Sequence, residues 1–297
     1  MSHISASSNS TRQTVAVIGC GDIGQRLASL LSTENHHVIG IRRSAHTHPT
    51  IEYRQADCTS RTELRQVLPE QSDVIVVTMT PPERSDLGYQ QAYVQVVDNL
   101  LHILESRSEK PRLILFVSST SVYAQSQGEW IDEDSQAQPT SFSGKRLLEA
   151  EQRLRDSDFN TTIVRFSGIY GPGRYRLIQQ VERGEDSPND PPLFSNRIHV
   201  QDCARVLKHL MAKAAPQALY LASDCSPTAL HDVKSWIAEA LELANDRQSS
   251  LTPSALRASK RIGNQRLLDS GFEFQYPTFQ SGYEEVIKRY LAENSSR

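Results

Sequence analysis

The sequence predicts an α/β protein built on a doubly wound parallel sheet, with a small C-terminal lobe. Short apolar runs bounded by turn residues alternate with longer helical patterns, which is typical of repeated βαβ units. Most of these apolar runs are continuous rather than alternating, as expected for strands covered by helices on both faces. The length of 297 residues exceeds the usual size of a single core, so a large domain carrying a smaller lobe is expected.

The apolar runs and helical patterns can be assigned along the chain. Strands are expected at residues 14–18, 38–41, 51–55, 74–78, 113–118, 162–166 and 218–222. Helices with an apolar stripe are expected at 24–32, 61–68, 89–106, 143–157 and 202–213. Beyond the last strand we expect a helix at 229–244, a polar linker at 245–254 and a terminal helix at 281–291.

A glycine-rich segment, GCGDIG, follows the first strand and opens the first helix. This placement lets main-chain N–H groups and the helix N-terminus face the pyrophosphate of a nicotinamide dinucleotide. Gly19 permits the tight turn, Gly21 lets the phosphate approach the backbone, and Gly24 lets the helix pack closely on the sheet. Asp22 and Ile23 complete the predicted loop. The alternative is an ordinary strand-to-helix turn whose glycines occur by chance.

The domain division follows from this motif and from a change in pattern at Gly171. Residues 13–170, completed by about 197–223, form the predicted Rossmann domain. From Gly171 the chain runs through a Gly/Pro-rich loop and a second polar stretch, so residues 171–196 and 224–297 are expected to form the small substrate-binding lobe. Residues 1–12 are polar and lack the apolar core of a signal peptide, which predicts a disordered tail.

Composition excludes several classes of partner. The formal net charge of −3 argues against nucleic acid or an anionic membrane, because either would favour a basic surface. No apolar run approaches membrane-spanning length.

The 4 cysteines lie far apart without a C-x-x-C pair, so neither a disulfide framework nor a thiolate zinc site is expected. His46 and His48 lack a third ligand at useful spacing, so no metal site is expected. A cytoplasmic protein with a small-molecule substrate fits best.

The end of the second strand predicts which dinucleotide is bound. An NAD-binding unit usually carries a carboxylate there, about 20 residues past the glycines, for the ribose 2′-hydroxyl. This chain has Arg42 and Arg43 instead, and guanidinium groups suit a 2′-phosphate, so NADP is preferred with NAD as the alternative. Both arginines could also be a solvated strand end. Asp57, followed by Cys58, is placed either to meet the adenine edge or to cap the next helix.

Hydroxyl groups gather after the fifth strand, in the segment FVSSTSVY. Ligands bind at the carboxyl ends of strands in open α/β folds. Ser119 and then Thr120 are the candidates for holding a reacting oxygen, and the alternative for both is capping of the strand end. The Tyr123 hydroxyl is interpreted as packing or as lining of a substrate pocket.

Several motifs together resemble one family. They are GCGDIG, VSSTSVY, RFSGIYGPG, RIHVQDCARVL and the C-terminal GFEFQYP, and they extend from about residue 15 to 277. The chain is similar to an extended short-chain dehydrogenase/reductase, in the NAD(P)-dependent sugar epimerase/dehydratase superfamily, in an atypical form.

The resemblance implies hydride exchange between a bound nicotinamide and a substrate carbinol or carbonyl, with a Tyr-x-x-x-Lys pair supplying the acid/base. The cation would bring the phenol pKa, ordinarily about 10, toward working pH. Here the segment is PTSFSGK, so Lys145 is present but Ser141 occupies the tyrosine position. A serine hydroxyl is a weaker acid on a shorter side chain and does not simply replace tyrosine. Lys145 can still bind the nicotinamide ribose, the alternative being an ordinary surface lysine.

The resemblance also implies further contacts to the cofactor. Thr78, Met79 and Thr80 would border its ribose and pyrophosphate, unless they only form a turn before the two prolines that follow. The backbone from Phe166 to Gly168 would face the nicotinamide carboxamide.

Three further predictions concern a candidate anion site in the lobe, the start of the helix expected at 202–213, and dimer formation. Arg174 and Arg197 could bind an anionic group of the substrate, although surface arginines are the commoner outcome. His199 and Asp202 are read as structural, with Asp202 capping the next helix. The helices at 89–106 and 143–157 are those that pair across a four-helix interface in this superfamily, so a homodimer is expected from resemblance alone.

Two functions remain open. One is an NADP-dependent oxidoreductase, epimerase or dehydratase in which Ser119 or Thr120 polarises the substrate oxygen. The other is an NADP-binding regulator or sensor that kept the cofactor site and lost turnover. The absent tyrosine favours the regulator, whereas the retained lysine, hydroxyl motif and glycine loop favour the enzyme.

Overall fold

A single parallel sheet forms the centre of the protein in this computed structural model, which describes residues 12–243, 248–249 and 259–295. Its strand order is β12-β7-β5-β4-β1-β2-β3. The strands are β1 (Thr14–Ile18), β2 (His37–Arg42), β3 (Glu52–Gln55), β4 (Val74–Val77), β5 (Leu113–Ser119), β7 (Thr161–Phe166) and β12 (Leu219–Ala222). The chain winds outward from β1 in both directions, so the predicted doubly wound sheet and its 7 strands are confirmed.

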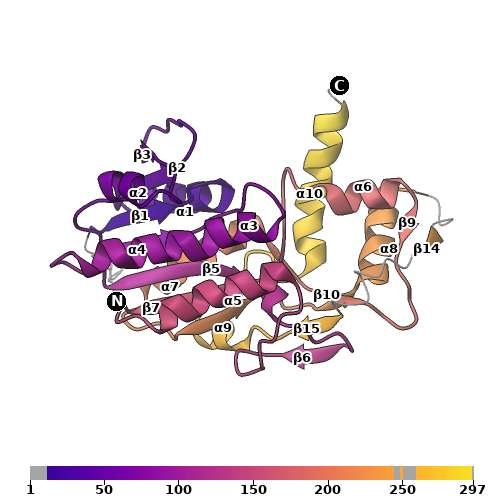
Figure 1. Cartoon of the computed structure of the whole chain (residues 1–297). Helices are drawn as coiled ribbons and strands as arrows, with labels where there is room; N and C mark the ends of the chain where they lie inside the picture. Colours follow the sequence, from indigo (N-terminus) through magenta and orange to yellow (C-terminus); the bar gives the residue numbers. More distant parts are fainter. Residues whose placement is uncertain (1–11, 244–247, 250–258, 296–297) are drawn as a thin grey trace, which may run out of the picture.

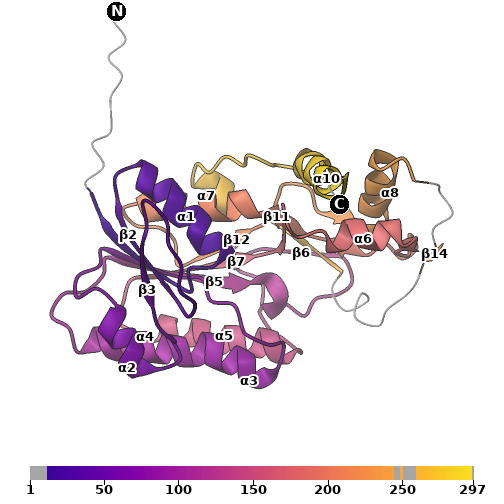
Figure 2. The same ribbon diagram turned by 90° about the horizontal axis from the view of Figure 1, so that it is seen from above.

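Helices cover both faces of the sheet, and this explains the continuous apolar strands (Figures 1 and 2). One face carries α1 (Asp22–Thr33) and α7 (Val200–Ala212). The other carries α2 (Arg61–Val67), α4 (Val96–Glu105) and α5 (Phe142–Arg155). The helix expected at 89–106 begins earlier, as α3 (Asp86–Tyr89), and passes through one π-helical segment, η1 (Gln90–Gln95), before α4. Apolar spacing alone does not distinguish such a segment from a regular helix.

The lobe packs beside the carboxyl edge of the sheet, around its own apolar cluster (Figure 1). Its helices are α6 (Arg176–Glu182), α8 (Leu230–Ala240) and α10 (Phe279–Ser295). The sequence reading missed α6, because its apolar stripe is short and lies between two polar loops. Three short strand pairs also form. Strand β8 (Gly168–Tyr170) pairs with β11 (Arg197–His199) where the chain enters and leaves the lobe, whereas β9 (Glu185–Asp186) with β14 (Gln248–Ser249) and β10 (Phe194–Ser195) with β13 (Thr228–Ala229) pair within the lobe.

A further strand pair and two short helices were also not predicted. Strand β6 (Glu129–Ile131) pairs in parallel with β15 (Lys260–Ile262), and the short helices are η2 (Thr120–Val122) and α9 (Gln265–Asp269). Leu267 of α9 packs in the same apolar cluster as Tyr220 of β12, so this helix lies against the main sheet although its residues were expected in the lobe. Three-residue strands separated by more than a hundred positions leave no periodic signal. The predicted tail, except for its last residue, and most of the linker at 245–254 fall outside the described residues. Within the described ranges, no helix is both long and apolar enough to cross a bilayer.

Candidate cofactor and substrate sites

The glycine loop is shaped by close packing at its two ends. Gly19 has φ +76°, and a Cβ there would lie 2.9 Å from the Met79 Cα and 2.7 Å from its Sδ. A Cβ on Gly24 would lie 2.9 Å from Val17 Cγ1. A Cβ on Gly21 would meet nothing closer than 3.8 Å. The loop therefore needs glycine for packing at its ends and leaves open space at its centre, where a phosphate would approach the backbone.

Thr78 supports this loop from the neighbouring strand end. Its buried Oγ1 donates to the Gly19 carbonyl at 2.9 Å. The amide N–H groups of Gly19 and Cys20 both donate to the Ile41 carbonyl at 3.0 Å. The loop is thus held between the ends of β2 and β4, and Thr78 acts on the loop rather than facing the cavity described next.

A cavity of about 560 Å³ opens over the carboxyl ends of β1 to β4. It brings together eight of the predicted cofactor residues, Gly19, Gly21, Arg42, Arg43, Asp57, Cys58, Met79 and Thr80. It also includes residues that sequence reasoning missed, namely Ser44, Ala56, Thr59, Pro82, Gln91 and Ala92. Gln91 and Ala92 come from the π-helical segment, whose contribution could not be foreseen from a regular helical pattern. Asp22, Ile23, Gly24, Lys145, Phe166 and Gly168 are not among the lining residues.

The basic side of this cavity lies at the end of β2. Arg42 donates from Nη2 to Ser44 Oγ at 3.1 Å, and Arg43 is exposed without an ion pair to any described residue. Asp57 supplies the carboxylate in the lining. Its Oδ1 accepts from the Thr59 N–H at 3.0 Å and from the Thr59 hydroxyl at 2.7 Å. The N-cap of α2 is Ser60, so the capping alternative for Asp57 is wrong.

The Cys58 thiol lines the same cavity but is kept un-ionised. Burial raises its pKa to about 12, with the Asp57 carboxylate adding to the shift. A thiol with such a pKa is a poor nucleophile at neutral pH, so Cys58 contributes packing and shape to the cavity.

The predicted catalytic hydroxyls lie at the end of β5 and the start of α5. Ser119 Oγ accepts from the Ser121 N–H at 3.2 Å and so caps η2, while Thr120 is buried. Ser141, at the expected tyrosine position, is the N-cap of α5 and accepts from the Gly144 N–H at 3.2 Å. Lys145 is exposed one turn further along. Ser141 therefore has a structural use, because serine is a favoured N-cap residue.

A buried polar network beneath this edge was missed by the sequence reading. Arg165 on β7 and Glu151 on α5 form an ion pair, with Arg165 Nε to Glu151 Oε1 at 2.9 Å and Nη2 to Oε2 at 2.5 Å. Glu151 is 0% and Arg165 2% exposed. Ser118 donates to Glu151 Oε1 at 2.6 Å. A glutamate on the apolar stripe of a predicted helix and an arginine inside a predicted strand were the available signals.

Tyr123 belongs to this network rather than to a substrate cavity. Its hydroxyl accepts from Arg165 Nη1 at 2.6 Å and donates to the Asp132 carbonyl at 3.1 Å. The side chain is 2% exposed, and burial raises the pKa of its phenol. Of the two readings of Tyr123, the structure places it in packing.

A second cavity, of about 300 Å³, lies between the β8–β11 pair and the lobe helices. Its lining includes Arg174 and Arg197 together with Arg176, Asn196, Tyr170 and Tyr283. Arg197 is 5% exposed. Its Nη2 donates to Ser195 Oγ at 2.6 Å, whereas its buried Nη1 has no hydrogen-bond partner among the described residues. The Nη1 atom is shielded from solvent, so it is the basic lining by Arg174, Arg176 and Arg197 that favours an anionic ligand in this cavity. Gly168 also lines this cavity, while Phe166 is buried in the core.

Asp202 and His199 are structural, but their roles differ from the expectation. His199 is the N-cap of α7, with Nδ1 accepting from the Gln201 N–H at 3.3 Å. Asp202 lies in the first turn and accepts from the backbone N–H groups of Gln275 and Tyr276, both at 2.9 Å. The prediction that Asp202 caps the helix is therefore wrong. This carboxylate instead ties α7 to the segment that leads into α10.

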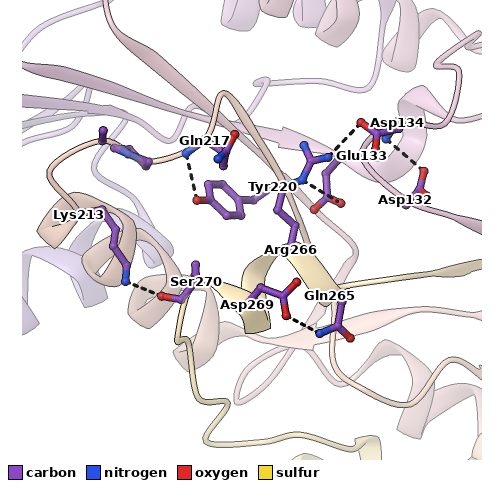
Figure 3. Close-up of a pocket in the computed structure, with 12 residues that line it drawn as sticks. Asp132, Glu133, Asp134, Lys213, Gln217, Tyr220, Gln265, Arg266, Asp269 and Ser270 are labelled. Atoms are coloured by element: carbon purple, nitrogen blue, oxygen red, sulfur yellow. Dashed lines mark hydrogen bonds and ion pairs between the residues drawn. The ribbon is translucent and has the colours of Figure 1, made fainter.

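A larger cavity, of about 910 Å³, lies at the outer edge of the sheet beside β12. Figure 3 shows that Arg266, Lys213 and Asp269 each bond other residues of the lining. Arg266 bonds Asp134 at 3.0 Å and lies 3.7 Å from Glu133, which in turn accepts from the Leu221 N–H at 2.8 Å. Lys213 donates to the Ser270 carbonyl. These groups close the edge of β12, and the cavity lies away from the glycine loop.

The two histidines of the H-x-H pair have local partners. His46 lies edge-on to Tyr53 with ring centroids 4.8 Å apart, and His48 Nδ1 accepts from the Thr50 N–H at 3.3 Å. Over the described part of the chain, no cluster of three or more His, Cys, Asp or Glu side chains could hold a metal ion.

Solved structures share this architecture over nearly the whole chain. A Methylobacillus flagellatus protein assigned to the NAD-dependent epimerases/dehydratases is 34% identical, with 95% of this chain and 100% of that chain covered and a TM-score of 0.78. The dTDP-glucose 4,6-dehydratase of Bacillus anthracis, solved with NAD, is 16% identical over 96% and 98% of the two chains, with a TM-score of 0.78. The Thermotoga maritima UDP-glucose 4-epimerase, solved with UDP-glucose, is 13% identical over 94% and 99%, with a TM-score of 0.79.

The last two likenesses show the fold alone. No curated protein matches the sequence. The model of the NAD dependent epimerase/dehydratase family matches residues 15–222, which include the glycine loop, the hydroxyl segment, Lys145 and the strands that frame them. The open centre of the loop and the basic cavity fit a dinucleotide. The chain therefore belongs to the NAD-dependent epimerase/dehydratase family.

Proposed function

We propose that this protein is an NADP-dependent oxidoreductase of the epimerase/dehydratase type. The observation that carries the cofactor choice is the end of β2, where Arg42, Arg43 and Ser44 line the cavity, whereas the carboxylate of the lining, Asp57, follows β3. A 2′-phosphate would accept charge-assisted hydrogen bonds there. NAD is the alternative, since NAD is bound in the solved Bacillus anthracis dehydratase.

The proposed substrate is a small hydroxyl or carbonyl compound that carries an anionic group, as sugar nucleotides do. The cavity lined by Arg174, Arg176 and Arg197 supports an anion, and the Thermotoga maritima epimerase was solved with UDP-glucose. The bound nicotinamide would supply hydride chemistry. Ser119 or Thr120 would hold the substrate oxygen and Lys145 the ribose hydroxyls. With serine at 141, the proton would come from water or from the substrate.

The second candidate is an NADP-binding regulator without turnover. The observation that favours it is that Ser141 caps α5 through its Oγ, so the position of the acid/base carries a structural group. A screen for hydride transfer with sugar nucleotides separates the two candidates. Net oxidation of NADPH by a carbonyl substrate, net reduction of NADP by a hydroxyl substrate, or conversion of the sugar nucleotide with the cofactor regenerated in each turnover would establish the enzyme. Tight NADPH binding without turnover, unchanged by Ser141→Tyr, would establish the regulator.

The cofactor site itself is tested by titrating NADPH and NADH against the protein and following the nicotinamide fluorescence. We expect saturable binding with NADPH the tighter ligand. Failure to bind either nucleotide would contradict both candidate functions.

A homodimer in the cytoplasm completes the proposal. Leu87 on α3 is 60% exposed and Phe142 on α5 is 41% exposed, and the Phe142 ring lies edge-on to Tyr89 with centroids 5.6 Å apart. Such side chains at neighbouring helix ends suit a partner surface. The described cysteines are free, which supports a reducing compartment. Light scattering should give twice the chain mass, and a monomer at micromolar concentration would contradict the dimer.

A further inference from the structure

Arg174 belongs to the loop that opens the lobe, yet its side chain reaches the glycine loop. Its Nη2 donates to Asp22 Oδ2 at 2.7 Å. The loop that carries it is a tight turn, in which the Arg174 N–H donates to the Gly171 carbonyl at 3.0 Å and Gly173 adopts φ +81°. The arginine also lines the 300 Å³ cavity of the lobe. One side chain therefore connects the lobe to the cofactor loop.

Asp22 is the first residue of α1 and directly follows Gly21, which lines the cofactor cavity. A carboxylate at this end of the helix is favoured by the helix dipole, but it would repel the pyrophosphate that the glycine loop holds. Burial opposes ionisation of Asp22, yet hydrogen bonds from Arg26 and Arg174 outweigh it and lower the pKa of the carboxyl. Asp22 is thus ionised, and two guanidinium groups offset its charge.

The two arginines differ in where they come from. Arg26 lies one turn further along α1, with its Nε 2.7 Å from Asp22 Oδ1, and its Nη1 donates to Gln201 Oε1 on α7 at 3.1 Å. It is therefore fixed within the main domain. Arg174 lies 152 positions away from Asp22 and comes from the lobe. Its contribution depends on the lobe loop keeping its place against the glycine loop.

We propose that Arg174 is a residue of the dinucleotide site, supplied by the lobe, which offsets the charge of Asp22 beside the cofactor pyrophosphate. Cofactor affinity then depends on the position of the lobe loop. The inference rests on the proposed function in one respect, which is that NADPH is the ligand of the glycine loop.

The test is a double-mutant cycle in NADPH binding, with Arg174→Gln, Asp22→Asn and both together, at about 0.1 M salt. Arg174→Gln should weaken NADPH binding about two- to tenfold, the range expected for a charge at a partly exposed site. Asp22→Asn should bind NADPH at least as tightly as wild type, and the double variant, which removes both charges of the pair, should bind about as tightly as wild type. Arg174→Lys should recover most of the lost affinity, because it keeps the charge.

Arg183→Gln is the matched control, because Arg183 forms an exposed ion pair with Glu185 in the same lobe, at 2.8 Å. It should leave NADPH affinity unchanged. The Arg174→Gln loss should shrink at about 1 M salt, where the Debye length falls to about 3 Å. An Arg174→Gln variant that binds like wild type, or a double variant that binds as weakly as Arg174→Gln, would overturn the inference. Wild type that binds neither NADPH nor NADH would instead overturn the proposed function.

Discussion

The cofactor cavity and the start of α5 lie at the same carboxyl edge of the sheet, but they use their polar groups differently. In the cavity Arg43 has no ion-pair partner among the described residues and Arg42 bonds Ser44 alone. At the start of α5, Ser141 and Ser119 both accept backbone N–H groups, and the layer beneath them is closed by Glu151 and its partners. The arginines of the cofactor cavity therefore remain free to bind a ligand, whereas the serines at the start of η2 and α5 cap these helices and stabilise the fold.

Removing Glu151 from the buried polar network that it forms with Arg165 should have the largest effect on the stability of the protein. Glu151→Ala leaves Arg165 buried without its counter-charge, which should cost about 3–5 kcal/mol of unfolding free energy. Glu149→Ala is the matched control on the same helix, because Glu149 pairs with Arg146 and Arg153 at the surface. It should cost less than about 1 kcal/mol. Urea denaturation of both variants measures the difference, and equal losses would contradict a closed layer.

On the lobe side, the carboxyl of Asp224 is buried, and its effect on the unfolding free energy depends on pH. Burial raises the pKa of Asp224 from 3.8 to about 7. The folded state therefore holds the proton more tightly than the unfolded state, and stability falls as pH rises from about 4 to about 7. Asp224→Asn removes this loss, which is of order 4 kcal/mol for a shift of about three pKa units. In wild type, Asp224 Oδ1 accepts a hydrogen bond from the Ser226 N–H at 3.2 Å, and the side-chain oxygen of asparagine can accept the same bond.

The measurement is the unfolding free energy of wild type and Asp224→Asn at pH 5 and pH 8. The variant should gain stability over wild type at pH 8 and gain less at pH 5. Asp134→Asn is the control, because the Asp134 side chain is 84% exposed. The same pH dependence in wild type and Asp224→Asn would show that this carboxyl ionises normally.

On the cofactor side, Gly19→Ala should separate backbone strain from crowding. Gly19 and Gly173 both have positive φ, +76° and +81°, but a Cβ on Gly173 meets nothing within 4 Å. Gly173→Ala should therefore cost only the backbone strain of about 1–2 kcal/mol. Gly19→Ala adds the clash with Met79 and should cost more, with loss of NADPH binding. Thermal unfolding and NADPH titration of the pair test this, and equal behaviour would contradict the packed loop.

The main sheet was predictable because most of its strands are continuous apolar runs and most of its crossover helices have a regular stripe. Eight residues of the cofactor cavity were predictable because they lie in the glycine loop or close to the ends of strands, whereas Gln91 and Ala92 of the π-helical segment were not. The Glu151–Arg165 pair was not, because nothing local tells a buried charged residue from an exposed one. The capping role of Asp202 was misassigned since its partners, Gln275 and Tyr276, lie far along the chain. The π-helical segment and β6 with β15 depend on tertiary contacts.

The relative affinity for NADPH and NADH tests the cofactor assignment most directly. Arg42→Asp places a carboxylate where the 2′-phosphate would lie. The variant loses the charge-assisted hydrogen bond from Arg42 to the 2′-phosphate and adds repulsion between that phosphate and the new carboxylate. The ratio of NADPH affinity to NADH affinity should therefore fall by about 10- to 100-fold. Fluorescence titration of wild type and Arg42→Asp with both nucleotides gives this ratio. A fall in the ratio, with NADH binding kept, is the result we predict, and an unchanged ratio would contradict the assignment of NADP to this cavity.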